Sequence, residues 1–510
     1  MTSKIYSAAT IGLEAKPIEV ESCITGGFVN FVIVGLPDTA VQESRERVKA
    51  AIKSSGFTFP RPRIAVNLAP ADIKKAGPSY DLPIAISLLC TSGTIKTTQA
   101  TPEDKHQNLF IGELALDGTL RRVNGILSIA TMATSLGAKT LYLPEDNARE
   151  AGLVPGFEII PVKNLRQLIL HLQGIELIAP YQRGKINLEN SGLSDFDMGF
   201  VKGQENAKHV LEIAAAGGHN ILMTGPPGSG KTLLARTLPT ILPRLTLNEA
   251  LEMTKIWSIA GLLPSSKPLI TERTFRSPHH TSSGVALVGG GTWPKPGEIS
   301  LAHRGVLFLD ELPEFNRSVL ENLRQPLEDG FVTVSRASGT LQFPAKFVLI
   351  AAQNPCPCGY LNDPNGKCDC LPGQISKYHR KISGPLLDRI DLHTTVPKID
   401  FDKLDDTTIG EPSRVIRERV QKARDIQTAR FKDLEIFTNT EMSSQTIKKF
   451  CPVNDESKQL LRQAVNLKNL SARGYFRVLK IARTIADLEE RENISPDDIA
   501  EAIQYRPEKN

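Results

Sequence analysis

The segment spanning residues 221–232 constrains this chain more than any other. It reads ILMTGPPGSGKT, an apolar run followed by the spacing Gly-x-x-x-x-Gly-Lys-Thr. A glycine-rich turn between a strand and a helix directs backbone N–H groups toward a polyanion, while the lysine reaches the β- and γ-phosphates and the hydroxyl ligates Mg²⁺. The segment therefore predicts a site for a nucleoside triphosphate with Mg²⁺. Its predicted binding residues are Gly225, Pro226, Pro227, Gly228, Ser229, Gly230, Lys231, Thr232 and Leu233.

The composition is that of a soluble globular protein. Of 510 residues, 40% are hydrophobic and 23% are charged, and the net charge is only +5, so any nucleic-acid contact must come from local basic clusters. Apolar runs such as 82–90 are shorter than the roughly 20 residues that a membrane helix needs, and the N-terminus has no signal-like segment. Seven cysteines, an odd number, indicate thiols in a reducing compartment. We expect a cytoplasmic protein without membrane contact.

Periodicity divides the chain into an N-terminal α/β domain (1–171), a linker (172–198), a second α/β unit (199–400) and an all-α lid (401–510). In the lid, residues 413–430 and 472–491 have helical periodicity, and Ser495 is a predicted N-cap. In the first domain, β-rich runs at 27–34, 63–68, 109–116 and 140–143 alternate with helical patterns at 41–54, 82–89 and 125–136.

Two further apolar runs in the second unit end in polar residues. Residues 305–309 precede Asp310 and Glu311, and residues 347–352 precede Gln353 and Asn354. Beside a phosphate loop, Asp310 would hold Mg²⁺ through water and Glu311 would polarise the attacking water. Asn354 would sense the γ-phosphate. The simpler alternatives are a strand that meets a solvated turn and an asparagine that forms a turn.

These strand ends resemble those of an AAA+ ATPase with a parallel sheet, and longer matches narrow the resemblance to the ComM/YifB family of magnesium-chelatase-like AAA+ proteins. The matching segments are VGLPD (34–38), GEL (112–114), FRSPHH (275–280), PGEISLAH (296–303), NPCPCG (354–359) and SGPLLDRID (383–391).

The resemblance implies roles for four more residues. Arg389 is similar to the arginine finger that a neighbouring subunit points at the γ-phosphate, and Arg473 to the sensor-2 arginine of the lid. Gly203 and Gln204 are similar to the segment that lines the adenine pocket. A finger acting in trans requires an oligomer, and the family implies a homo-hexamer. The alternative for Arg389 is a surface salt bridge with Asp388 or Asp391.

Two additions to the nucleotide-binding unit are candidate DNA contacts. Residues 271–304 are an expected insert that contains His279, His280, Trp293 and Lys295. Residues 331–346 are an expected hairpin with Arg336 near its tip. The resemblance to minichromosome-maintenance helicases suggests that both line a central pore and contact DNA. The alternative is that both serve subunit packing.

Four cysteines gather within a short loop, the pairs Cys356/Cys358 and Cys368/Cys370. Four thiolates suit a tetrahedral structural Zn²⁺, although the Cys-x-Cys spacing is tighter than the usual one. Four reduced thiols are the alternative.

The N-terminal domain resembles the proteolytic domain of Lon, around 75–79 and across 112–147. Ser79 occupies the nucleophile's place, and the place of the lysine base falls on Leu127. A leucine cannot accept a proton, so we expect an inactive protease fold that serves in subunit packing or as a DNA-guiding collar.

The resemblance implies a hexameric ATP-driven DNA motor, a helicase that promotes branch migration in homologous recombination or natural transformation. The alternative is a magnesium-chelatase-type or unfoldase-type motor that remodels a partner protein without DNA.

Overall fold

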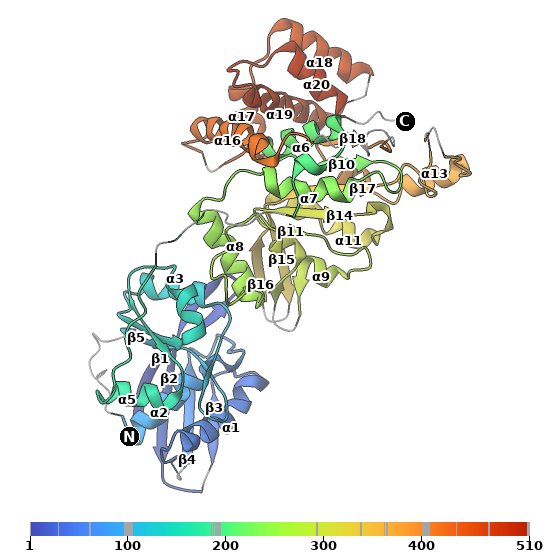
Figure 1. Ribbon diagram of the computed structural model, residues 1–510. Helices are drawn as coiled ribbons and strands as arrows, with labels where there is room; N and C mark the ends of the chain where they lie inside the picture. The colour runs from blue at the N-terminus through green and yellow to red at the C-terminus, as the bar shows by residue number, and fades with distance from the viewer. Residues whose placement is uncertain are drawn as a thin grey trace.

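The computed structural model consists of two α/β domains followed by a helical domain, arranged in chain order from one end of the molecule to the other (Figure 1). The residues described are 2–28, 30–60, 63–95, 106–184, 186, 188, 195–291, 294–336, 339–361, 363, 366–399, 409–434, 436–467 and 470–506. Within this part of the chain, no helix is long and apolar enough to cross a membrane.

The N-terminal domain contains a seven-stranded mixed sheet with the strand order β3-β4-β2-β1-β5-β8-β9. Its strands are β1 (Thr2–Ile11), β2 (Glu14–Thr25), β3 (Phe31–Val34), β4 (Arg63–Ala69), β5 (Asn108–Phe110), β8 (Thr140–Pro144) and β9 (Glu158–Val162). Its helices are α1 (Thr39–Ser54), α2 (Asp81–Thr91), α3 (Ile126–Ser135), α4 (Ala148–Ala151) and α5 (Leu165–Leu172). The three predicted helices are confirmed with small shifts of their ends. The predicted strand 109–116 is instead β5 and a two-stranded ribbon of β6 (Glu113–Leu114) and β7 (Leu120–Arg121).

The long hairpin of β1 and β2 was not predicted, because its buried face carries small hydroxyl groups. Ser3 and Ser22 are almost fully buried, and each donates a hydrogen bond to the carbonyl oxygen of Ser87 in α2, at 2.7 and 2.9 Å. These partners satisfy groups that would otherwise be costly to bury. The apolar alternation that predicts a strand is therefore interrupted.

Part of the predicted linker packs on this domain. Ile178 and Tyr181 contact its apolar core, and Arg183 donates to the carbonyl oxygen of Phe157 at 2.5 Å.

The central domain is built on a five-stranded sheet with the order β11-β14-β17-β10-β18, in which every pair is parallel. Its strands are β10 (Ile221–Thr224), β11 (Phe275–Arg276), β14 (Val306–Leu309), β17 (Val348–Gln353) and β18 (Leu392–Thr395). Phe308 and Ile350 point into the core cluster on one face, while Leu307 and Leu349 point into the cluster on the other. Both faces are buried, which explains the continuous apolar runs in the sequence.

Helices and two additions complete the central domain. The helices are α6 (Glu205–Gly217), α7 (Lys231–Ile241), α8 (Leu247–Ala260), α9 (Gly284–Val288), α10 (Glu298–Leu301), α11 (Arg317–Glu321), α12 (Arg324–Asp329), α13 (Pro372–His379) and α14 (Gly384–Leu387). The expected insert consists of β11, α9, the short ribbon of β12 (Gly289–Gly290) and β13 (Lys295–Pro296), and α10. The expected hairpin is β15 (Phe331–Arg336) paired with β16 (Gly339–Pro344).

The described C-terminal residues form the expected helical domain. Its helices are α16 (Ser413–Arg430), α17 (Ser444–Phe450), α18 (Asp455–Leu467), α19 (Ala472–Leu488) and α20 (Pro496–Gln504). Ser495 caps α20 as predicted, by accepting a hydrogen bond from the backbone N–H of Asp498. An ion pair connects this domain to the central one. Buried Asp391, just before β18, pairs with Arg477 of α19 at 3.0 Å. Residues 401–408, with which the predicted lid begins, lie outside the described residues.

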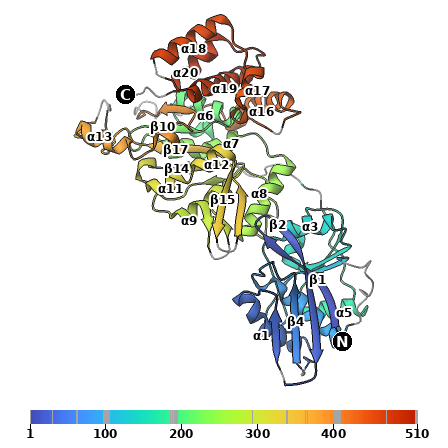
Figure 2. The same cartoon turned by 180° about the vertical axis from the view of Figure 1, so that it is seen from behind.

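The N-terminal and central domains meet at α3 and α8 (Figure 2). Ser258 of α8 accepts a hydrogen bond from the backbone N–H of Gly125 at 2.9 Å and donates one to the buried Glu150 carboxylate at 2.5 Å. At the tip of the β1–β2 hairpin, Leu13 packs on the same core cluster as Leu341 of β16. The N-terminal domain thus contacts both the nucleotide-binding core and its hairpin.

Candidate nucleotide-hydrolysis site

Three adjacent strands of the central sheet end in the residues predicted to bind and hydrolyse ATP. β17 lies between β10 and β14, so the phosphate loop, the acidic pair and Asn354 share one edge of the sheet. Ligands of parallel α/β sheets bind at this edge, beyond the carboxyl ends of the strands. The sequence separates these groups by many residues, and the sheet order brings them together.

The phosphate loop has the backbone that its glycines were expected to provide. Gly228 and Gly230 have φ angles of +75° and +88°, which favour glycine. A Cβ at Gly225 would lie 2.1 Å from the carbonyl oxygen of Val396, so only glycine fits there. The Lys231 ammonium donates to the carbonyl oxygens of Gly225 and Pro226 at 2.7 and 2.9 Å.

The predicted magnesium ligands lie side by side. The Thr232 hydroxyl donates to Asp310 at 3.0 Å, and the other carboxylate oxygen of Asp310 accepts from the backbone N–H of Glu311 at the same distance. A hydroxyl and a carboxylate are oxygen donors of the kind that Mg²⁺ prefers, so the pair fits this cation. The Glu311 side chain is 55% exposed, which leaves its carboxylate accessible to water.

Asn354 completes the contacts around the lysine. Its side-chain oxygen lies 3.4 Å from the Lys231 ammonium. Burial lowers the pKa of Lys231, whereas the charges of Asp310 and Glu311 raise it and so oppose the shift. Lys231 thus contacts Asn354 directly and lies within the electrostatic influence of both acids.

Gln204 reaches the phosphate loop from the start of α6. Its side-chain amide donates to the carbonyl oxygens of Ser229 and Pro397, at 3.4 and 2.5 Å. Gly203 and Gln204 both have positive φ angles, +56° and +62°, which turn the chain sharply before the helix. The structure thus brings the expected adenine-pocket segment next to the loop.

The two predicted arginines converge on one carboxylate outside the phosphate loop. Buried Arg389 forms an ion pair with Glu328 and donates to the carbonyl oxygen of Pro385 at 2.7 Å. Arg473, which is exposed, lies 3.9 Å from the same Glu328. Arg389 therefore forms a salt bridge within the chain, as the alternative interpretation expected, but its partner is Glu328 and not Asp388 or Asp391.

His280 lies at the hydrolysis site, a placement that sequence reasoning missed. Its Nδ1 atom is 3.6 Å from a carboxylate oxygen of Glu311, and the His279 ring packs on it with the centroids 4.1 Å apart. The contact arises because β11, which precedes these histidines, pairs with β14, which precedes Glu311. The strand signal before the histidines, at the start of the expected insert, was the available clue.

The other DNA candidates lie in the two additions, which pack against each other. Leu287 and Ile299 of the insert share a core cluster with Val332 and Phe343 of the hairpin. Lys295 is exposed on β13. Arg336 ends β15 opposite Gly339, while its side chain, Trp293 and residues 337–338 lie outside the described residues.

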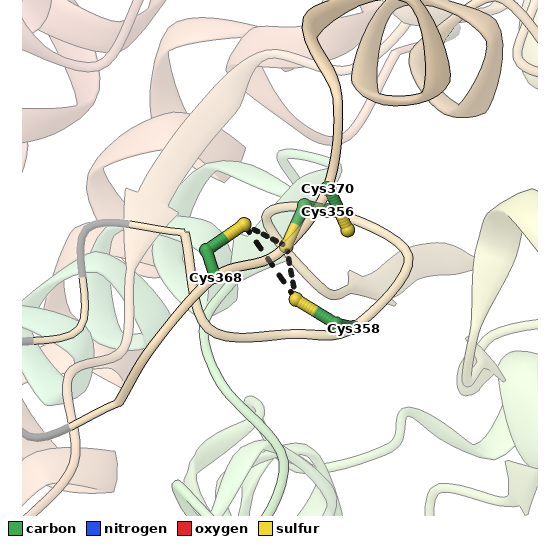
Figure 3. Close-up of side chains that lie close together, drawn as sticks. All are labelled: Cys356, Cys358, Cys368 and Cys370. Atoms are coloured by element: carbon green, nitrogen blue, oxygen red, sulfur yellow. Dashed lines mark hydrogen bonds between the residues drawn. The ribbon is translucent and has the colours of Figure 1, made fainter.

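The four clustered cysteines form a compact group after β17 (Figure 3). Their sulfur atoms lie within 4.8 Å of one another, and all four are free thiols.

The region expected to correspond to a protease site contains no proton acceptor at the predicted position. Leu127 is fully buried at the start of α3, and its backbone N–H donates to the Glu150 carboxylate at 3.0 Å. Ser79 lies in a short 3-10 helix (Pro78–Tyr80), where its carbonyl oxygen accepts from the backbone N–H of Gly112 at 3.0 Å.

A phosphate loop, an acidic pair and a polar sensor on the strand order β11-β14-β17-β10-β18, with a helical domain after them, define a P-loop ATPase of the AAA+ class. Models of the magnesium chelatase subunit ChlI match residues 20–147 and 197–404, and a model of its C-terminal region matches 410–506. The chain belongs to the ComM/YifB family of magnesium-chelatase-like AAA+ ATPases.

Similar proteins cover almost the whole chain. It is 42% identical to the competence protein ComM of Haemophilus influenzae, over 98% of this chain and 97% of that protein. It is also 42% identical to the uncharacterized protein YifB of Escherichia coli, over 99% and 97%. The magnesium-chelatase 38 kDa subunit of Rhodobacter capsulatus is 24% identical over 58% of this chain and 81% of its own length.

Proposed function

We propose that this protein is a homo-hexameric motor that couples ATP hydrolysis to translocation on DNA, and that it promotes branch migration during homologous recombination or natural transformation. The observation that carries the DNA part is the packing of insert and hairpin into one unit beside the ATP site. Through β11 and β14, the same unit reaches Glu311. A movement of the Glu311 side chain would thus be transmitted to the insert and the hairpin, the surface that we propose contacts DNA.

The hexamer is supported by the two arginines. Arg389 and Arg473 meet at Glu328, whereas Lys231 is surrounded by groups of the phosphate loop and by Asn354. An arginine that does not contact the phosphate loop of its own subunit is suited to complete the ATP site of a neighbouring subunit. In the oligomer, Glu328 would release Arg389 to the γ-phosphate of that neighbour.

The finger is tested with Arg389→Ala. We expect kcat for ATP to fall about 10³-fold, the scale of arginine fingers in trans, while ATP binding persists. Glu328→Ala serves as the matched control, since it removes the partner but keeps the guanidinium. Normal hydrolysis by Arg389→Ala would contradict the assignment.

The DNA substrate is tested with a labelled forked or four-strand junction. The wild type should move the junction when ATP is present, and Glu311→Gln should bind DNA but leave the junction in place.

The similarity to a magnesium-chelatase subunit favours a second candidate, a motor that remodels a partner protein. ATPase rates with and without single-stranded DNA separate the two: stimulation supports the DNA motor, and indifference favours the protein remodeller.

A further inference from the structure

We propose that Cys356, Cys358, Cys368 and Cys370 bind one Zn²⁺, and that this metal holds the loop after β17 against the phosphate loop, so that metal occupancy sets the rate of ATP hydrolysis. The proposal rests on the ATPase activity and not on DNA as the substrate.

The sulfur positions already approach those of a tetrahedral site (Figure 3). Sγ of Cys356 lies 3.3 Å from that of Cys358, and Sγ of Cys368 lies 3.6 Å from both. Four thiolates around zinc, each with a Zn–S distance of about 2.3 Å, lie about 3.8 Å apart. Disulfide sulfurs would lie about 2.05 Å apart, much closer than these. All four ligands come from one loop, so small side-chain rotations complete the site.

The first cysteine pair is joined to the phosphate loop by Gly359. This residue has a φ of +87°, and its backbone N–H donates to the carbonyl oxygen of Cys356 at 3.0 Å, which closes a turn around Cys358. A Cβ at Gly359 would lie 2.5 Å from Cδ of Pro227 in the phosphate loop. The turn therefore packs closely on the loop that would hold the triphosphate.

The turn around Cys358 also lies close to Asn354, the expected sensor of the γ-phosphate. Asn354, two positions before Cys356, contacts the Lys231 ammonium at 3.4 Å. The metal would therefore restrain one end of the segment whose other end touches the catalytic lysine.

The second cysteine pair leads into the segment that carries the arginine finger. Cys370 lies two positions before α13, and His379 at the end of that helix lies 3.1 Å from the carbonyl oxygen of Pro355. Lys381, just beyond, pairs with Glu314 at 3.0 Å, and α14 then leads to Arg389. A metal bound by both cysteine pairs would link the end of β17, where Asn354 lies, to the segment that leads to Arg389. The link would reduce the conformational freedom of that segment when ATP binds.

The test uses the full-length protein purified without chelator. Metal analysis should find about one Zn²⁺ per chain in the wild type and in the control Cys23→Ser/Cys90→Ser, whose thiols lie outside the cluster. The double variant Cys368→Ser/Cys370→Ser should lose the metal, and its kcat should fall at least about tenfold, on the scale expected when a catalytic group is misplaced. Far-UV circular dichroism checks that it folds. Cobalt-substituted wild type should show the absorption of a tetrahedral thiolate site.

If the double variant does not fold, zinc is released from the wild type with a thiol-specific mercurial. Adding thiol and Zn²⁺ should then restore hydrolysis, and adding thiol alone should not. Well under one Zn²⁺ per wild-type chain, or equal zinc in the double variant, would overturn the metal site. Wild-type kcat in the metal-free protein would overturn the coupling. An ATPase that DNA fails to stimulate would count against the DNA motor and leave this proposal standing.

Discussion

The two α/β domains differ in how their charged groups are used. In the N-terminal domain, buried Asp81 is held by Arg47 at 2.7 Å, and buried Lys75 donates to the carbonyl oxygen of Pro70. In the central domain, Asp310 and Glu311 follow a buried strand, and the Glu311 side chain is more than half exposed. Buried charged groups need partners because their desolvation is costly, whereas an exposed carboxylate beside a phosphate loop is available for chemistry. We infer that the groups that hydrolyse ATP lie in the central domain.

The largest expected effect is that of Glu311→Gln. An amide cannot take a proton from water, so kcat for ATP should fall about 10³-fold with little change in ATP affinity. Steady-state hydrolysis and binding of a fluorescent ATP analogue measure the two quantities. Glu418→Gln, a substitution of the exposed glutamate that pairs with Arg414 in α16 at 2.9 Å, is the matched control. Unchanged hydrolysis in Glu311→Gln would refute its role as the base.

A smaller effect is expected for His280→Ala. We infer that the imidazole positions the Glu311 carboxylate, so kcat should fall about tenfold while KM for ATP stays the same. His209→Ala is the control, because its imidazole pairs with Glu501 of α20 at 2.8 Å. An increase in kcat would instead mean that His280 restrains the acid, which contradicts a positioning role.

The junction of the domains should show a smaller, pH-dependent effect through Glu150. Burial raises the pKa of this carboxyl, although Ser258, Leu127 and Arg122 oppose the shift. The pKa of Glu150 is thus higher in the folded protein than in the unfolded chain. Glu150 therefore contributes fully to stability below the ordinary glutamate pKa of about 4.3. That contribution is lost as the pH rises through the pKa of the folded state.

Glu150→Gln removes this titration. The free energy of unfolding of the wild type, relative to that of the variant, should decrease from pH 4 upward, by on the order of 1 kcal/mol. Urea unfolding at several pH values measures this difference. A difference that increases with pH would mean that the carboxylate is stabilised by Arg122 and that its pKa is lowered. Ser258→Ala, which removes the partner in the central domain, tests whether the contact across the junction contributes.

Much of the nucleotide site could be predicted because each part is a local pattern. The apolar runs before Thr224, Asp310 and Asn354 give both the strands and the polar residues at their ends. The helical periodicity of residues 413–430 predicted both ends of α16 correctly. The contacts between His280 and Glu311, and between Arg389 and Glu328, depend on strand pairing and packing across distant segments. No local pattern encodes them.

The smallest expected effect is that of Ser79→Ala, for which we predict unchanged ATP hydrolysis. The described interaction of Ser79 is made by its backbone carbonyl oxygen, which alanine keeps, and the predicted position of the base is occupied by the buried side chain of Leu127. A serine without a base is a poor nucleophile. Casein and peptide cleavage, with and without ATP, should therefore be absent in the wild type and in Ser79→Ala alike. Cleavage that requires Ser79 would mean that another group serves as the base, with buried Lys75, whose pKa is lowered by burial, the first to examine, and the contrast between the two domains would be lost.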